Sequence, residues 1–176
     1  MDKPQSNIGF KLMSIFFSSR YKPDFLERTL KEAGLQPGFC VLDYGCGPGG
    51  FSIAAAEMVG ESGRVYALDI HPLAEKNVKK LAAKRKLANV ETICSDCATG
   101  LESESIDVVL LYDILHGLSE KNKVLAELHR VMKPDALLSF SDHHLKKEKI
   151  LAAVTENGLF KFTQKGELTY SFVKSG

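Results

Sequence analysis

Residues 39–52 read Phe39-Cys-Val-Leu-Asp-Tyr-Gly-Cys-Gly-Pro-Gly-Gly-Phe-Ser52, and the rest of the chain can be placed around them. A short apolar run ends at Asp43, a turn with four glycines in six residues follows, and residues 51–59 read as an alanine-rich helix. Glycines lack a Cβ atom, so a ligand can approach the backbone, and the start of a helix has free N–H donors. The stretch therefore predicts a buried strand, a ligand-binding turn and a helix. A plain turn would not need so many glycines, which cost chain entropy.

Two ligand classes compete for this turn. Three of its glycines match the G-x-G-x-x-G pattern of dinucleotide-binding proteins, and Asp69 follows at about the spacing of the acid that binds a ribose. Two residues argue against a pyrophosphate. Asp43 would bring a negative charge close to the phosphates, and Pro48 removes one backbone N–H from the turn. A ligand that carries an amine and a sulfonium tolerates both features.

The turn also matches the form D-x-G-x-G-x-G through Asp43, Gly45, Gly47 and Gly49. In this form it resembles the glycine motif of class I S-adenosylmethionine-dependent methyltransferases. Further segments are similar to the branch of that family typified by the ubiquinone/menaquinone-biosynthesis methyltransferases, namely Asp113-Ile-Leu-His-Gly-Leu118 and Leu128-His-Arg-Val-Met-Lys-Pro134. The resemblance implies S-adenosylmethionine as cofactor, S-adenosylhomocysteine as product and methyl transfer to a small molecule. A module that binds the adenosyl ligand without catalysis is the alternative.

The composition is that of an ordinary globular protein. The chain has 176 residues, of which 44% are hydrophobic and 26% are charged, and 23 Lys and Arg balance 22 Asp and Glu. This balance gives no reason to expect a nucleic acid or an anionic membrane as a partner. No apolar run is long enough for insertion into a membrane, and residues 1–7 show no signal-peptide pattern. We therefore expect one domain, 1–176, in the cytoplasm.

The four cysteines are too few for a disulfide scaffold. Cys94 and Cys97 have C-x-x-C spacing, but a zinc site would need a second such pair. We expect buried small residues near the ends of strands, and no metal. A thiol site for arsenic or a metal is the minor alternative.

Apolar runs alternate with helical patterns along the chain. The expected strands are 39–42, 64–70, 90–94, 106–112 and 136–141, and a final hairpin pairs 159–164 with 168–173. The expected helices are 8–19, 24–34, 50–59, 72–87, 119–132 (with Ser119 as its cap) and 146–157. Near-continuous apolar strands joined by helices indicate a parallel sheet covered on both faces. The resemblance implies an α/β, three-layer, Rossmann-like methyltransferase sandwich. Its seven-stranded, mostly parallel sheet would have the order 3-2-1-4-5-7-6 and include the antiparallel hairpin.

Ligands of open parallel sheets bind beyond the carboxyl ends of the strands. Asp69 ends the second strand, where its carboxylate can accept both hydroxyls of a ribose. The resemblance implies that Asp96 accepts from the adenine amine, that Cys97 lies beside the ring and that Tyr112 faces the methionine part. One of Arg20 and Tyr21 is expected to bind the methionine carboxylate. The predicted cofactor-binding set is Tyr21, Asp43, Gly45, Cys46, Gly47, Gly49, Asp69, Ile70, Asp96, Cys97 and Tyr112.

Methyl transfer requires alignment of the acceptor, and a base only where the acceptor must lose a proton. His116 follows the fourth strand closely and is the first choice for this base. Asp113, at the end of the same strand, and His143, after the fifth strand, complete the predicted catalytic set. His144 is a further candidate, and Asp142 is placed to polarise a substrate group or to orient a histidine. A role in packing is the competing interpretation for each histidine.

Residues 1–21 form the remaining predicted unit. Apolar side chains at 8, 12, 15 and 16 share one helical face, and those at 10, 13 and 17 lie nearby. Only one helix separates the fifth strand from the hairpin, so the sequence contains no inserted cap over the acceptor. We therefore expect residues 8–19 to cover the acceptor side of the site, as a lid or as part of a homodimer contact. A helix packed permanently on the flank of the sheet is the alternative.

Overall fold

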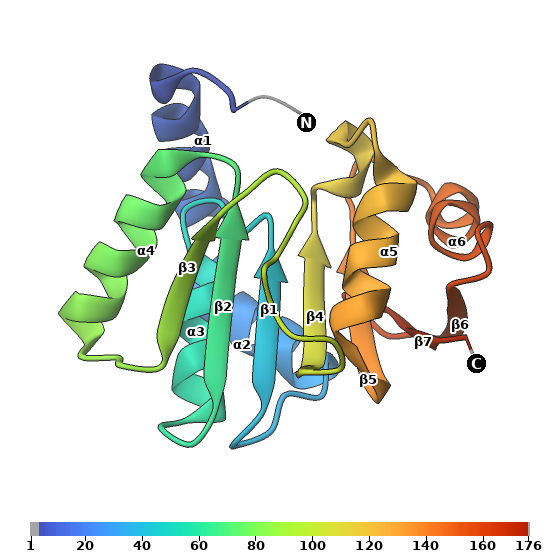
Figure 1. Cartoon of the computed structure of the whole chain (residues 1–176). Coiled ribbons are helices and arrows are strands. Elements are labelled where there is room, and N and C mark those ends of the chain that lie inside the picture. Colours follow the sequence, from blue (N-terminus) through green and yellow to red (C-terminus); the bar gives the residue numbers. More distant parts are fainter. Residues whose placement is uncertain (1–3, 176) are drawn as a thin grey trace.

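The computed structural model describes residues 4–175, apart from the side chain of Ser18, so the first three residues of the predicted unit 1–21 lie outside it. Its centre is a seven-stranded sheet with the order β3-β2-β1-β4-β5-β7-β6, which confirms the predicted topology (Figure 1). Five strands are parallel, while β7 is antiparallel to β5 and β6 is antiparallel to β7. The strands are β1 (Cys40–Tyr44), β2 (Arg64–Asp69), β3 (Val90–Cys94), β4 (Ile106–Tyr112), β5 (Met132–Ser141), β6 (Phe160–Lys165) and β7 (Tyr170–Lys174).

Helices cover both faces of the sheet because side chains of each strand alternate between two apolar clusters. Val41, Val108 and Leu110 join the cluster that contains α2 (Pro23–Glu32) and α3 (Gly50–Val59). Their neighbours Leu42, Val109 and Leu111 join the cluster of α5 and α6 on the other face. The remaining helices are α1 (Asn7–Arg20), α4 (Pro72–Arg85), α5 (Lys121–Val131) and α6 (Lys147–Thr155).

Two helices matter most for the site. The helix α4 packs on Ala67 of β2 through Ala74 and Val78, beside α3. The helix α1 crosses the edge at which the parallel strands end, above the first half of the sheet (Figure 1). None of the helices within residues 4–175 is long and apolar enough to span a membrane.

Several predicted boundaries differ from the observed ones by one or two residues, and two further differences concern α5 and β5. The N-cap of α5 is Glu120, not Ser119, because a short 3-10 helix over Leu115–Gly117 leads the chain into α5 one residue later than expected. The strand β5 begins at Met132, four residues before the predicted start at 136, because Met132 pairs with Ile106. The register shifts after this pair, and such an irregularity tolerates Pro134, which cannot donate to a regular ladder.

Candidate active site

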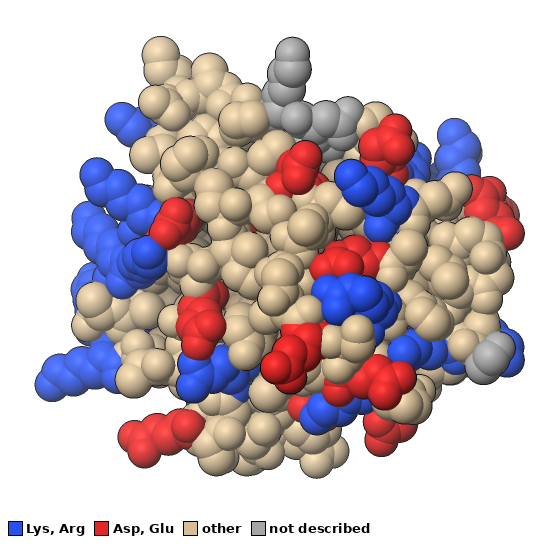
Figure 2. Space-filling view, in the orientation of Figure 1, with Lys and Arg blue, Asp and Glu red and all other residues tan. Residues whose placement is uncertain are grey.

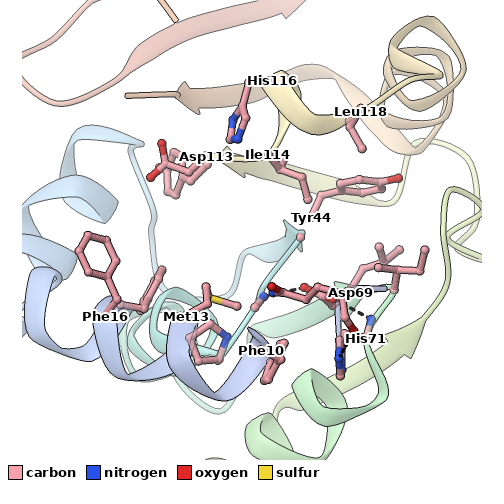
Figure 3. Close-up of a pocket in the computed structure, with 18 of the residues that line it drawn as sticks. Phe10, Met13, Phe16, Tyr44, Asp69, His71, Asp113, Ile114, His116 and Leu118 are labelled. Atoms are coloured by element: carbon pink, nitrogen blue, oxygen red, sulfur yellow. Dashed lines mark hydrogen bonds between the residues drawn. The ribbon is translucent and has the colours of Figure 1, made fainter. Parts of the chain in front are cut away.

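A cavity of about 460 Å³ lies at the carboxyl ends of the parallel strands and is covered by α1 (Figure 3). This volume lies in the range of small-molecule sites. In Figure 3, Phe10 and Met13 of α1 lie across the cavity from Ile114 and Leu118, with Asp69 between them. The predicted residues that line it are Tyr21, Gly45, Gly47, Asp69, Ile70, Asp96, Tyr112, Asp113, His116 and His143.

The glycine turn forms one end of the cavity. We call this turn and the neighbouring Asp69 the turn end. Gly45, Gly47 and Gly49 all have positive φ, at 80°, 51° and 90°. A Cβ atom at Gly45 would collide with Ile114, and one at Gly49 with Val78, so these two glycines allow protein segments to pack closely. A Cβ atom at Gly47 would meet only Met13 Cε, at 3.8 Å. A side chain at Gly47 would therefore occupy the cavity itself.

Asp69 is fixed by the backbone on both sides. Its Oδ2 accepts a hydrogen bond from the Gly47 N–H at 2.8 Å, and its Oδ1 accepts one from the His71 N–H at 2.8 Å. Burial raises the pKa of Asp69 above its ordinary value, and these two N–H donors oppose that shift. Each carboxylate oxygen keeps a second lone pair for a ligand donor. The turn end thus offers a rigid acceptor for hydroxyl groups next to an open backbone.

His71 and Phe10 also line the turn end; Phe10 belongs to the segment 8–19 expected to cover the acceptor side, whereas His71 is not among the predicted site residues. The buried His71 ring caps α4 by accepting from the Leu73 N–H at 3.1 Å, and its Nε2 lies 3.0 Å from the Gln5 carbonyl oxygen. It stacks on Phe10, with ring centroids 4.4 Å apart. These contacts hold the start of α1 over the cavity. The available signal was the position of His71, directly before a proline at the start of α4.

Three histidines and Asp113 line the other end of the cavity, and the buried Asp142 lies behind them. We call these five residues the histidine end. His116 Nδ1 lies 3.0 Å from Asp142 Oδ2, and the His116 N–H donates to the same oxygen at 3.1 Å. Asp142 Oδ1 accepts from the His144 N–H at 3.0 Å, and the Asp142 side chain is fully buried. With Nδ1–H donating to Asp142, the His116 Nε2 is left as an acceptor.

Asp113 makes a second pair with His143, at 2.6 Å between Asp113 Oδ1 and His143 Nδ1, and its other oxygen accepts from the Tyr21 hydroxyl. Burial alone would raise the pKa of Asp113, but the hydrogen bonds from Tyr21 and His143 outweigh it and lower the pKa. Burial, followed by the Asp113 contact, raises the pKa of Tyr21, which therefore stays protonated as a donor. Asp113 adopts a positive φ of 53°, a strained conformation for a residue other than glycine.

The rings of the histidine end form a continuous group. The His144 centroid lies 4.2 Å from that of His116 and 3.9 Å from that of His143. All three histidines line the cavity. The predicted acid–base residues are therefore brought together at one end, with a carboxylate behind two of the three rings.

Four predicted cofactor residues do not line the cavity. Asp43 is buried and accepts a hydrogen bond from the hydroxyl of Ser52, near the start of α3, at 2.5 Å. Burial raises the pKa of Asp43 to about 7, although the hydrogen bond from Ser52 opposes the shift. Cys46 packs in the cluster of Ala67 and Val78. Gly49 is the N-cap of α3, and Cys97 belongs to the core on the α5 side. These four residues therefore pack behind the residues that line the cavity.

The cysteines, possible metal-binding groups and the two candidates for the methionine carboxylate can now be placed. Cys94 is exposed, so the prediction of buried cysteines is wrong at that position, although Cys46 and Cys97 are buried. Within residues 4–175, no group of three or more His, Cys, Asp or Glu is placed to hold a metal ion. Of the two candidates for the methionine carboxylate, Tyr21 lines the cavity, whereas Arg20 lines a smaller hollow beside it.

Known proteins resemble this chain in sequence and in structure. The model of the methyltransferase domain family matches residues 35–176. A crystal structure of a SAM-dependent methyltransferase from Aquifex aeolicus has a TM-score of 0.82 and 27% identity, and the match covers 97% of this chain and 100% of that chain.

Two curated relatives are named for quinone methylation. The demethylmenaquinone methyltransferase of Geobacillus sp. is 32% identical over 69% of this chain and 53% of its own length. The ubiquinone/menaquinone biosynthesis C-methyltransferase of Marinomonas sp. is 26% identical over 76% of this chain and 54% of its own length. The chain spans about half the length of the curated relatives it matches.

The resemblance noted for the glycine motif is thus confirmed over most of the chain. At this motif the chain forms a turn that leaves room for a ligand against the backbone, next to a fixed carboxylate. The chain belongs to the family of S-adenosylmethionine-dependent methyltransferases, whose cofactor is S-adenosylmethionine and whose product form is S-adenosylhomocysteine.

Proposed function

We propose that this protein transfers a methyl group from S-adenosylmethionine to a small-molecule acceptor. The observation that carries the proposal is that one cavity is lined both by the turn end, with Gly47 and Asp69, and by His116, which pairs with Asp142 behind the cavity wall. The proposed cofactor site and the candidate base therefore open into the same cavity. When bound, the cofactor supplies an electrophilic methyl group on a sulfonium, which an acceptor displaces in line.

The turn end fits the adenosyl part of the cofactor. Asp69 is the proposed acceptor for the two ribose hydroxyls, because its oxygens are held by two N–H groups and keep lone pairs toward the cavity. Asp96, which lines the cavity on the connection after β3, is the proposed partner of the adenine amine. The Tyr44 hydroxyl steadies this connection by donating to the Asp96 carbonyl at 3.2 Å. Gly47 gives the remaining part of the ligand access to the backbone.

The histidine end supplies the proposed acid–base chemistry. His116 takes a proton from the acceptor at Nε2, since its Nδ1 faces Asp142. Asp142 is the positioning residue, because it is fully buried and its second oxygen is fixed by the His144 N–H. Asp113 and His143, the rest of the predicted set, orient the acceptor from the other side of the ring group, and Tyr21 fixes Asp113.

The acceptor we propose is a small, largely apolar molecule with one group that can lose a proton. Phe16, Phe17, Ile114 and Leu118 give the cavity apolar walls, and the polar atoms around the acceptor come from the histidine end. The names of the relatives make ring compounds of the quinone type the first acceptors to test. All four cysteines are free thiols, in keeping with the reducing cytoplasm, where we place the reaction.

Two measurements test the function. Calorimetry should show that the protein binds S-adenosylmethionine and S-adenosylhomocysteine, with no binding of NAD. Transfer of a labelled methyl group should then be measured over a panel of ring acceptors with and without an ionisable hydroxyl. Binding of NAD alone would overturn the proposal. Tight binding of S-adenosylhomocysteine without transfer to any member of the panel would favour the non-catalytic binding module.

We further propose that α1 is a lid within one chain. Its Phe10, Met13 and Phe17 cover the cavity, and two polar contacts hold it, from His71 to Gln5 and from Tyr21 to Asp113. A lid must open to exchange ligands, so its amides should exchange with solvent faster than those of α3 in the free protein. S-adenosylhomocysteine should slow that exchange. Slow exchange in both states, with lost stability on removal of residues 1–19, would show that α1 is permanent core.

A further inference from the structure

The outward side of α1 is unusually apolar. Of the five exposed large hydrophobic side chains in the described part of the chain, four lie on this helix and are 58–73% exposed. At about 100° per residue they form one stripe, which we call the outer stripe: Ile8, Leu12, Ile15 and Phe16. In Figure 2, α1 projects from the top of the molecule as a largely uncharged surface.

The opposite side of α1 is apolar as well. Phe10, Met13 and Phe17 point to the cavity, and at about 100° per residue their mean direction lies about 150° around the helix from that of the outer stripe. Phe16, at the margin of the outer stripe, also lines the cavity. A helix that is apolar on two opposite faces is ordinarily covered on both. Packing on the protein covers only the inner face, so the outer stripe has the character of a docking surface.

Basic side chains predominate around the outer stripe. The sequence of α1 contains no acid, and Lys11 is exposed on this helix. The neighbouring α4, which meets α1 where Phe10 stacks on His71, presents a row of exposed lysines that form no salt bridge within residues 4–175. These are Lys76, Lys80 and Lys84, followed by Lys86 at the C-cap of the helix. Figure 2 shows this basic surface on the flank directly below α1.

We propose that the outer stripe docks on an anionic lipid surface, with the basic row of α4 facing the headgroups. An interfacial helix of this kind combines shallow insertion of apolar side chains with attraction between lysines and anionic lipids. The helix is also the cover of the cavity, so docking would place that cover at the lipid surface. The inference goes beyond the proposed function, and its test does not depend on catalysis.

Charge and area disfavour a second copy of the chain as the occupant. A two-fold contact through the outer stripe would bring two copies of Lys11 and of the basic row close together. Four side chains of at most ~250 Å² each, about two-thirds exposed, also offer less than the ~800 Å² that each partner buries in a standard interface. A lipid surface needs no such area, because each inserted side chain contributes separately.

Co-sedimentation of the full-length protein with vesicles tests the proposal. Vesicles of phosphatidylcholine with about one-third phosphatidylglycerol should bind the protein, binding should fall at high salt, and vesicles of pure phosphatidylcholine should bind at least about tenfold more weakly. The double variant Leu12→Ser, Ile15→Ser should lose about tenfold or more in binding to the anionic vesicles. Neither residue lines the cavity, so melting temperature and affinity for S-adenosylhomocysteine should stay unchanged.

Matched controls lie on the distant strand β6. Phe162→Ser removes the fifth exposed large apolar side chain of the described residues, which lies outside α1. Lys161→Glu reverses one exposed charge. Neither variant should alter vesicle binding. The double variant Lys76→Glu, Lys80→Glu, which reverses two charges of the basic row, should weaken binding to the anionic vesicles. Wild-type binding by the double variant of the outer stripe would overturn the proposal. Failure of the wild-type protein to bind vesicles would also overturn the proposal. If, in that case, sedimentation velocity shows a dimer that the double variant of the outer stripe disrupts, the occupant of that stripe is a second copy of the chain.

Discussion

The turn end and the histidine end of the cavity are held together in different ways. At the turn end, Gly47 follows β1 and Asp69 ends the adjacent strand β2, and the Gly47 N–H donates to Asp69 Oδ2 at 2.8 Å. At the histidine end, side chains far apart in the chain hold one another, such as Tyr21 on Asp113 and His116 on Asp142. The turn end should therefore be sensitive to added volume, and the histidine end to loss of particular functional groups.

The sharpest test of the turn end is Gly47→Val. The new side chain would occupy the cavity and strain a backbone with positive φ, so affinity for S-adenosylhomocysteine should fall by at least about 10²-fold, from loss of ~3 kcal/mol or more. Calorimetry measures the loss. Gly158→Val is the control, because Gly158 also has positive φ but faces open space away from the cavity. Equal affinity of a folded Gly47 variant and the wild type would place the ligand elsewhere.

The turn end was predictable because its determinants are local. The glycine motif follows an apolar strand, and Asp69 ends the next one, so strand pairing brings them together without further information. Asp43 shows the limit of this reasoning. It belongs to the motif, but alternation along β1 turns its side chain toward Ser52 instead of the cavity. Membership in a motif identified the segment, whereas the direction of each side chain required the structure.

The principal test of the histidine end is His116→Ala. If His116 is the base, turnover should fall by about 10²–10⁴-fold, while affinity for S-adenosylhomocysteine stays unchanged. The wild-type rate should fall on acidification, because an imidazolium cannot accept a proton. Asp113 should add no further limb to the profile, since the hydrogen bonds from Tyr21 and His143 outweigh burial and hold its pKa low.

Two controls separate catalysis from packing. His129→Ala removes a histidine on α5 that lies against Phe160, away from the cavity, and should leave turnover unchanged. Asp142→Asn should lower turnover less than His116→Ala and change the pH profile, because it alters only the group that positions His116. An active His116 variant with the wild-type pH profile would assign this residue to packing.

The histidine end was only partly predictable. His116, Asp113 and His143 were placed near the ends of β4 and β5 by counting from the strands, and the cavity does gather them. The sequence placed Asp142 where it could orient a histidine, but which carboxylate pairs with which histidine was not accessible, because the pairing depends on the 3-10 helix at Leu115–Gly117 and on the positive φ of Asp113. The same holds for His71, whose contact with Gln5 spans 66 residues.

Asp69→Ala should have a smaller effect than either change above. The proposed hydrogen bonds from ribose hydroxyls to a carboxylate contribute about 1.5–3 kcal/mol, so affinity for S-adenosylhomocysteine should weaken by about 10- to 150-fold. Loss of the carboxylate also frees the Gly47 and His71 N–H groups. Glu61→Ala, at an exposed acid, is the control in the same calorimetric assay. An unchanged affinity would remove Asp69 from the site.

The smallest predicted effect concerns the connection between β3 and β4, which carries Asp96 to the turn end. Glu127 of α5 anchors this connection by accepting from the Thr99 N–H at 2.9 Å and the Thr99 hydroxyl at 2.6 Å. It also pairs with Arg130, which in turn donates to the Leu101 carbonyl at 2.9 Å. The hydrogen bond from Arg130, joined by those from Thr99, outweighs burial and lowers the pKa of Glu127 to about 2.

Glu127→Gln should therefore lower the free energy of unfolding by about 1–2 kcal/mol at neutral pH, a value reduced by the solvent exposure of Arg130. Because the pKa is lower in the folded state, the stabilisation is complete above the ordinary value of about 4.5 and is lost as the pH falls toward 2. Urea unfolding of both proteins between pH 7 and pH 3 should show the two stabilities converging. Glu102→Gln, at an exposed acid in the same connection, should show no such convergence. A constant difference across this range would mean that the charge of Glu127 does not hold the connection, and that Asp96 owes its position to the Tyr44 contact instead.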